Sequence, residues 1–150
     1  MSSLSRHFVL DASVFVADAR PSEPGHADAN ALLIALAGPE LMLYIPNIAQ
    51  TEIASALARA LDDADLALET ATMYRSWPGA QVEVVDETLG DLAARLAAEH
   101  RLRGCDAIYV ALAQARDAVL VSFDREQLER SPADLVARTP GEVLADLAAT

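Results

Sequence analysis

The sequence predicts an α/β protein in which a central, mostly parallel sheet of about five strands lies between two layers of helices. Short apolar runs alternate along the chain with longer helical patterns, as in strand–helix–strand units. The runs are apolar throughout, which is typical of parallel strands buried on both faces. With 150 residues, 53% of them hydrophobic, the chain suits a single domain, 1–150, with a substantial core.

The first third of the chain predicts two strands with helices between them. A strand over Phe8–Leu10 is followed by a short helical turn over Ser13–Asp18 and by a loop containing Pro21 and Pro24. A helix starting near His26 repeats apolar residues at spacings of three and four until Gly38-Pro39 ends it. Its apolar positions are Ala29, Leu32, Leu33, Leu36 and Ala37.

The middle of the chain predicts a helical pair. A strand at Met42–Ile45 ends at Pro46, and Asn47 is a candidate N-cap for a helix that reaches about Leu61. A second helix is expected from about Ala64 to Trp77. The pair is rich in Ala and Leu and is more apolar than one sheet face needs. We therefore expect part of it to form a homodimer interface, with simple core packing as the alternative.

The last part of the chain continues the alternation and ends in a helix with a strong start signal. Pro140 occupies a first-turn position there, and Glu142 can reach back to the Thr139 cap. The other predicted elements are a strand at Val82–Val85, a helix over about Glu87–Arg101, a helix Ala107–Ala115 opened by Asp106, a strand at Ala118–Val121, a helix Arg125–Leu128 and a strand at Leu135–Ala137.

Four acids stand where this fold would aim them at one point: Asp11, Glu52, Asp106 and Asp124. Asp11 and Asp124 close predicted strands, beyond whose carboxyl ends α/β proteins bind ligands. Glu52 and Asp106 lie near helix starts, where acids are tolerated. Close carboxylates raise each other's pKa unless a cation lies between them, and oxygen ligands suit Mg²⁺ or Mn²⁺ better than Zn²⁺. The acids therefore predict metal-assisted hydrolysis of a nucleic-acid phosphodiester.

Each acid also has a simpler structural interpretation. Asp11 could be a turn former or helix cap, and Glu52 an ordinary exposed helix acid. Asp106 could be only the N-cap of the helix after it, and Asp124 only a helix start. Acids that cluster at one place mark sites, so all four together favour a shared site over four independent roles.

Charge and composition limit the function classes. The chain has 23 acids and 11 basic residues, all arginine, for a net charge of −12, so weak nonspecific nucleic-acid binding is expected. Arg101, Arg103 and Arg125 could contact a nucleic-acid backbone locally or could be solvated surface. No apolar stretch approaches the roughly 18 residues of a membrane helix, and the start lacks a signal-peptide core, so a cytoplasmic protein is expected. Cys105 is expected to be a small buried thiol.

Four segments, in order and spacing, resemble a PIN-domain ribonuclease, and in particular a VapC-type toxin. They are residues 8–16 (FVLDASVFV), 51–56 (TEIASA), 104–113 (GCDAIYVALA) and 120–124 (LVSFD), and the resemblance covers essentially the whole chain. It implies a PIN-like three-layer α/β/α fold and a Mg²⁺- or Mn²⁺-dependent endoribonuclease. It also implies an RNA substrate and a small antitoxin partner encoded beside the toxin.

The resemblance carries individual residues with it. Asp11, Glu52, Asp106 and Asp124 match the family's metal-site acids. Ser13 and Ser122 match positions where the family often has a hydroxyl near the metal or its waters. Family members typically leave a 5′-phosphate and a 3′-hydroxyl, which agrees with attack by water rather than by the RNA 2′-hydroxyl.

Other function classes stay open or are disfavoured. A catalytically silent PIN-like protein or RNA binding module is the main alternative, against which the full set of acids argues. An Asp-nucleophile phosphatase needs a second Asp two residues after the first, where Ser13 stands. A Ser-His-Asp hydrolase would need a Gly-x-Ser-x-Gly turn, which the sequence lacks. The RNA that is cut, the metal used and a toxin or housekeeping role stay open.

Overall fold

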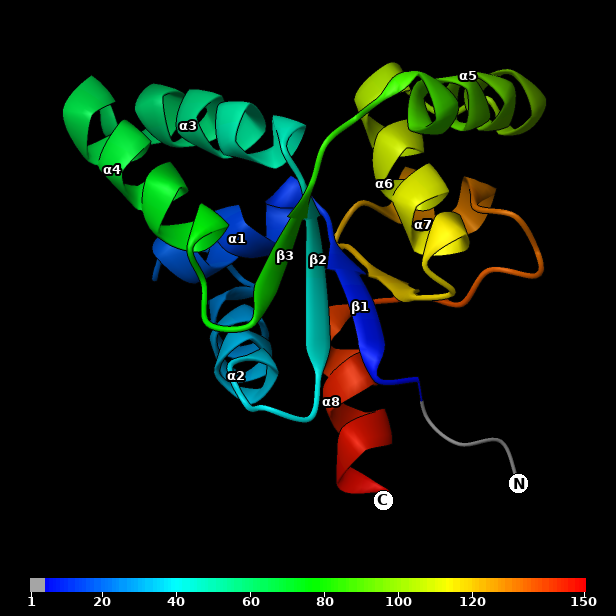
Figure 1. The fold of residues 1–150 in the computed structure, drawn as a ribbon. Coiled ribbons are helices and arrows are strands. Elements are labelled where there is room, and N and C mark those ends of the chain that lie inside the picture. Colours follow the sequence, from blue (N-terminus) through cyan, green and yellow to red (C-terminus); the bar gives the residue numbers. More distant parts are fainter. Residues whose placement is uncertain (1–4) are drawn as a thin grey trace.

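A five-stranded, all-parallel sheet in the order β3-β2-β1-β4-β5 forms the centre of the computed structural model, which describes residues 5–150 (Figure 1). The prediction of a mostly parallel sheet of about five strands is confirmed. The strands are β1 His7–Leu10, β2 Met42–Pro46, β3 Ala80–Glu83, β4 Val119–Val121 and β5 Ala137–Arg138. The helices are α1 Ala12–Ala19, α2 His26–Leu36, α3 Ile48–Leu61, α4 Ala64–Arg75, α5 Glu87–His100, α6 Gly104–Ala115, α7 Arg125–Arg130 and α8 Pro140–Ala148.

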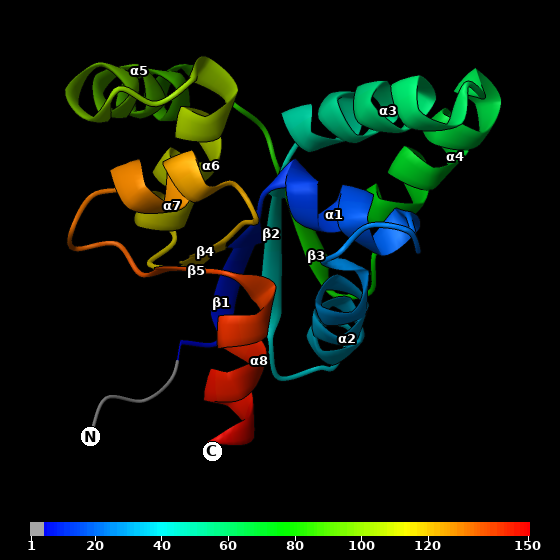
Figure 2. The same cartoon turned by 180° about the vertical axis from the view of Figure 1, so that it is seen from behind.

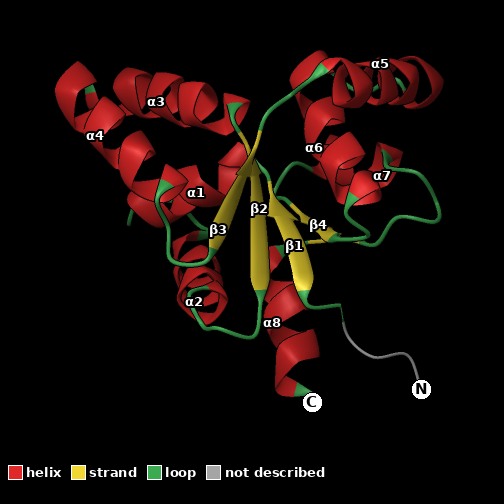
Figure 3. Cartoon of the chain, in the orientation of Figure 1, coloured by secondary structure: helices red, strands yellow, loops and turns green. Residues whose placement is uncertain are grey.

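Helices cover both faces of the sheet (Figure 3). Helix α6 packs on β1, β2 and β4 and carries α5 on its outer side. On the opposite face α1 contacts β1 and α2, and α2 contacts α8, which lies in front of the sheet in the view from behind (Figure 2). Helices α3 and α4 pack as a pair beside α1. The α3–α4 and α5–α6 pairs therefore lie on opposite sides of the carboxyl ends of the central strands (Figure 1).

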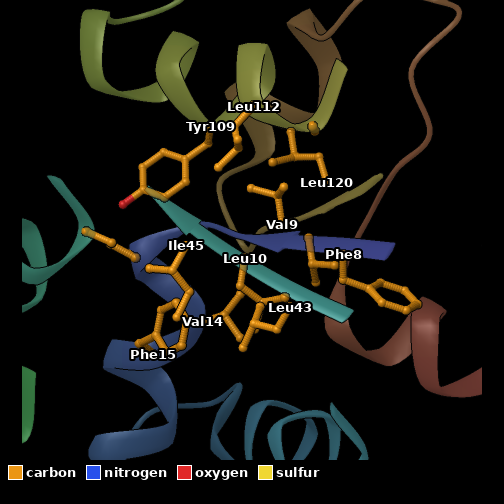
Figure 4. Packing of buried hydrophobic residues seen from close by; sticks show 14 of the residues in the cluster. Phe8, Val9, Leu10, Val14, Phe15, Leu43, Ile45, Tyr109, Leu112 and Leu120 are labelled. Carbon is orange, nitrogen blue, oxygen red and sulfur yellow. The ribbon is translucent and has the colours of Figure 1, made fainter. Parts of the chain in front are cut away.

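The core explains why the first strand is apolar at every position. Strand β1 lies between β2 and β4, and its register pairs Val9 with Leu120. Val9 and Leu120 lie toward Tyr109 of α6, whereas Leu10 and Leu43 lie on the other side of the sheet (Figure 4). All five are fully buried. A strand with helices on both faces has no side exposed to water, so alternation disappears.

Two strands are displaced from their predicted ranges. Strand β3 spans Ala80–Glu83 rather than Val82–Val85, because its register places Ala80 opposite Leu43 and leaves Val84 beyond the pairing, with 67% of its surface exposed. Strand β5 is Ala137–Arg138 rather than Leu135–Ala137. The Leu135 amide is used in a turn to the carbonyl of Pro132, so the strand starts later.

One helix start differs from the prediction, and another lies where it was predicted but lacks a capping hydrogen bond from the side chain. Helix α6 begins at Gly104 with Arg103 as its N-cap, so the expectation that Asp106 opens this helix is wrong. Asn47 precedes α3 but makes no side-chain cap; its Oδ1 instead accepts from the Val85 amide at 3.3 Å and ties α3 to the chain leaving β3. The Thr139–Glu142 capping box of α8 is confirmed. Among the helices within residues 5–150, none has the length and apolarity needed to cross a bilayer.

Candidate active site

The four predicted acids come from segments that meet at the carboxyl edge of the three central strands. Asp11 directly follows β1, and its amide donates to the Val121 carbonyl of β4 at 3.0 Å. Asp124 lies three residues beyond the end of β4. Glu52 lies in α3, which follows β2, and Asp106 lies in the first turn of α6. The chain passes from β1 to β2 on one side while β4 lies on the other, so strand order reverses at β1, where α/β sheets bind ligands.

A serine hydroxyl links the two strand-end aspartates. Ser122 Oγ donates to Asp11 Oδ2 at 3.2 Å and accepts from the Asp124 amide at 2.9 Å. Ser13 supports the same region, because its amide donates to Asp11 Oδ2 at 3.1 Å and its Oγ accepts from the Phe123 amide at 3.2 Å. Both predicted serines therefore contact the segments that carry the acids, and Ser122 is completely buried.

Asp11 and Asp124 also cap helices, as their simpler interpretation predicted. Asp11 accepts from the Ser13 amide at the start of α1, and Asp124 Oδ1 accepts from the Gln127 amide at 3.1 Å at the start of α7. In each case the capping bond uses one carboxylate oxygen. Within residues 5–150 no hydrogen bond reaches the other oxygen of either carboxylate.

Glu52 has a partner that the sequence did not reveal. Tyr109, fully buried in α6, donates its hydroxyl to Glu52 Oε1 at 2.6 Å. The ring belongs to the hydrophobic core, and its hydroxyl points out of that cluster (Figure 4). A tyrosine three residues after Asp106 has helical core spacing, so the pattern indicated only burial. The contact joins α6 to α3 across the candidate site.

Gln127 is the second residue that sequence reasoning missed. It is completely buried in α7, and its Nε2 donates to the Asp106 carbonyl at 3.1 Å. Its only sequence signal is a position three residues after Asp124, which is the capping distance. The Asp106 carboxylate itself accepts no hydrogen bond from a side chain or amide in the described part of the chain, so only its backbone is held.

Burial and mutual repulsion raise the pKa of three of the acids. Burial raises the pKa of Asp11 most, the hydrogen bonds from Ser13 and Ser122 oppose it, and the charge of Asp124 adds to it. For Glu52, burial raises the pKa, the Tyr109 hydroxyl opposes it and Asp11 adds to it.

Asp106 shows the coupling most clearly. Burial and the charges of Asp11, Asp124 and Glu52 raise its pKa from 3.8 to about 6, against an opposing effect of Arg103. Asp106 therefore responds to all three other acids. The candidate site concentrates negative charge that the protein alone neutralises poorly.

The donor set fits a hard divalent cation. All four side chains offer carboxylate oxygens, and a cation would relieve the repulsion that raises their pKa values. Within residues 5–150, however, no three His, Cys, Asp or Glu side chains are spaced closely enough to hold a metal ion together. The acids are near enough to shift one another's pKa values, but their side chains would have to move closer together to bind one ion.

The other residues singled out in the sequence are exposed. Arg101, Arg103 and Arg125 all lie at the surface, and the Arg101 carbonyl accepts from Arg130 at 2.7 Å. Cys105 is exposed in the first turn of α6, so the expectation of a buried thiol is wrong. The earlier start of α6 accounts for this, because the first turn carries Cys105 out toward solvent next to Asp106.

Comparisons with known proteins agree with the fold. Residues 8–131 match the PIN domain family. VapC20 of Mycobacterium tuberculosis, a sarcin-ricin loop cleaving toxin, is 21% identical, with a TM-score of 0.71 over 86% of this chain and 96% of its own. PAE2754 of Pyrobaculum aerophilum is 26% identical, with a TM-score of 0.69 over 96% of this chain and 90% of its own.

A more distant structure shares the same fold. VapBC2 of Rickettsia felis, bound to a fragment of promoter DNA, is 14% identical, with a TM-score of 0.69 over 89% of this chain and 98% of its own. The comparison with curated proteins found no match. The PIN-like three-layer α/β/α prediction is confirmed. Because the family match runs from β1 to just beyond α7 and the solved structures share the whole architecture, this chain belongs to the PIN-domain family.

Proposed function

We propose that this protein is a divalent-metal-dependent endoribonuclease that uses Mg²⁺ or Mn²⁺ and serves as the toxin of a toxin–antitoxin pair. Proteins of the PIN and VapC families are nucleases. The observation that carries the proposal for this chain is the convergence of Asp11, Glu52, Asp106 and Asp124 at one sheet edge, where burial and the charges of the other three acids raise the pKa of Asp106 to about 6.

Asp11, Glu52 and Asp106 are the proposed metal ligands, and Asp124 completes the site directly or through water. A bound divalent ion would lower the pKa of a water molecule and neutralise charge developing on the phosphate. The residues of the chain orient this set: Ser122 joins the Asp11 and Asp124 segments, and Tyr109 fixes one oxygen of Glu52. Ser13 and Ser122 are proposed to lie near the ion or its waters.

Asp106 gives the proposed site a proton requirement. Its pKa of about 6 means that a sizeable fraction of the carboxyl is protonated in mildly acidic solution. A cation needs the deprotonated form, so binding would displace that proton. Cleavage should therefore weaken as the pH falls through about 6.

The net charge of −12 shapes how RNA would bind. Nonspecific attraction to phosphate is weak for such a surface, so binding would depend on the metal and on exposed arginines near the acids. Arg103, which already acts electrostatically on Asp106, is the best placed of these.

We also propose an antitoxin partner, a homodimer and a cytoplasmic location. A similar fold occurs in a toxin–antitoxin complex from Klebsiella pneumoniae, at 18% identity and a TM-score of 0.60. The α3–α4 pair exposes large apolar side chains, which supports its use as the dimer surface. They are Leu61, Leu66, Leu68 and Met73.

One observation favours the alternative of a catalytically silent PIN-like binding module. No three of the described acidic, His or Cys side chains are spaced to hold an ion. If the acids cannot draw together around a cation, the module would bind a partner and not cut it.

The test incubates purified protein with labelled total RNA, with Mg²⁺, with Mn²⁺ and with chelator. Asp106→Asn is the inactive variant, and Asp146→Asn, which changes an exposed acid of α8, is its matched control. Discrete metal-dependent cuts made by wild type and control but absent with Asp106→Asn would support the nuclease. Folded, antitoxin-free wild type that is inert with every metal would favour the binding module.

A further inference from the structure

Gln127 connects the segments that carry two of the candidate acids. Its backbone amide donates to Asp124 Oδ1 and its side-chain Nε2 to the Asp106 carbonyl, both at 3.1 Å. The backbone carbonyl of Gln127 also accepts two hydrogen bonds, from the Ser131 amide at 3.1 Å and from the Ser131 hydroxyl at 2.7 Å. One side chain therefore spans from α7 to the first turn of α6.

The Asp106 carbonyl does not need the Gln127 side chain as a hydrogen-bond donor. The Asp106 carbonyl lies in an α-helix, where it has an acceptor role toward the amide four residues on, so the Gln127 bond is an additional one. The direction of the amide is fixed, because turning it over would place two oxygens against each other.

The side-chain amide of Gln127 is also expected to lower the stability of the fold relative to an apolar side chain. Gln127 Oε1 is buried and has no hydrogen-bond partner among residues 5–150. A buried acceptor without a partner costs free energy, whereas an apolar side chain of the same shape would carry no such cost. Buried polar groups of this kind call for an explanation other than packing.

We propose that Gln127 is a positioning residue that sets the separation between Asp106 and Asp124. This inference rests on the proposed nuclease function and deepens it. The amide fixes the first turn of α6 against α7, and the carboxylates at the two helix starts keep a defined spacing as a result. Partners that orient metal-binding side chains typically change affinity or activity about 10- to 100-fold when removed.

The test replaces Gln127 by Met, which keeps the length of the side chain and removes both the donor and the acceptor. Gln114→Met makes the same change at an exposed position of α6 and is the control. Three quantities are compared: the melting temperature without metal, the Mn²⁺ dissociation constant by titration calorimetry, and kcat and KM for RNA cleavage.

The expected result separates positioning from structural support. Gln127→Met should melt at or above the wild-type temperature, bind Mn²⁺ about 10-fold more weakly and lose kcat by a similar factor, with KM little changed. Gln114→Met should match wild type in all three.

Several results would overturn the inference. Unchanged Mn²⁺ affinity and kcat in Gln127→Met would show that the amide positions nothing. A lower melting temperature or failure to fold in both Gln127→Met and Gln127→Leu would assign a structural role instead. If the wild type binds Mn²⁺ but does not cut RNA, only the nuclease proposal is contradicted, because the comparison of Mn²⁺ affinities still tests the role of Gln127. Wild type that binds no Mn²⁺ would leave no ligand set to position and would also overturn it.

Discussion

Replacing Asp106 by Asn should make the metal-free protein more stable at neutral pH while abolishing cleavage. The carboxyl titrates near pH 6 in the folded protein, against 3.8 for an ordinary aspartate, because burial and three neighbouring acids disfavour its charge. The folded state thus binds this proton more tightly than the unfolded state. Stability from Asp106 is full below about pH 4 and is lost as the pH rises through about 6. Asparagine has the same shape and no charge to lose.

The magnitude follows from the two pKa values. A difference of about 2 corresponds to about 3 kcal/mol for a fully buried group at pH above 7. Asp106 is only partly buried, and solvent screens such interactions strongly, so about 1 kcal/mol is the expected gain. For a chain of this size that corresponds to a rise in melting temperature of about 2–4 °C.

Thermal melts between pH 5 and pH 8 in chelator measure this directly. The advantage of Asp106→Asn over wild type should be largest at pH 8 and shrink toward pH 5. Mg²⁺ should stabilise wild type more than the variant, because a ligand that binds only the folded state adds to its stability. Asp146→Asn is the control and should lack the pH-dependent gain. A variant that melts below wild type at pH 8, or whose advantage does not change with pH, would refute the electrostatic coupling of the acids.

Two further predictions test other parts of the site. Tyr109→Phe removes the hydroxyl that holds Glu52 Oε1 at 2.6 Å; we expect kcat/KM to fall about 10-fold and the pH profile of cleavage to move upward, since that hydrogen bond lowers the pKa of Glu52. An unchanged profile would contradict this. Gly25→Ala places a Cβ 2.5 Å from Cζ of Phe123, so unfolding in urea should show a loss of about 1–3 kcal/mol. Gly90→Ala meets no atom within 4 Å, lies inside α5 and should gain about 0.5–1 kcal/mol. Equal effects at the two glycines would show that the Phe123 contact is unimportant.

The sheet and its acids were predictable because their signals are local. A continuous apolar run followed by an aspartate can be recognised from neighbouring residues alone, as at Val9-Leu10-Asp11. Parallel strands then bring the carboxyl ends of such runs to one edge of the sheet. A run that is apolar at every position fits a central strand such as β1, which is buried on both faces. The position of Asp11 in the fold follows directly.

The parts that were missed depend on tertiary contacts. Strand β3 is an edge strand whose limits are set by its pairing with β2, so propensity alone placed it two residues late. The contacts of Tyr109 to Glu52 and of Gln127 to Asp106 join residues 57 and 21 positions apart. Such spacings carry no periodic signal, and the amino-acid types by themselves indicate only a core aromatic and a helical polar residue.

Asp11 and Asp124 cap helices as well as carrying charge, and this decides which substitution should be used to make an inactive variant. Asp11 and Asp124 each use one oxygen to start a helix, and an asparagine side chain retains an oxygen that can do this. Alanine would remove the start of α1 or α7 along with the charge. An inactive variant made to capture the proposed antitoxin should therefore carry asparagine at these positions, so that the surface around them stays as it is in the unmodified protein.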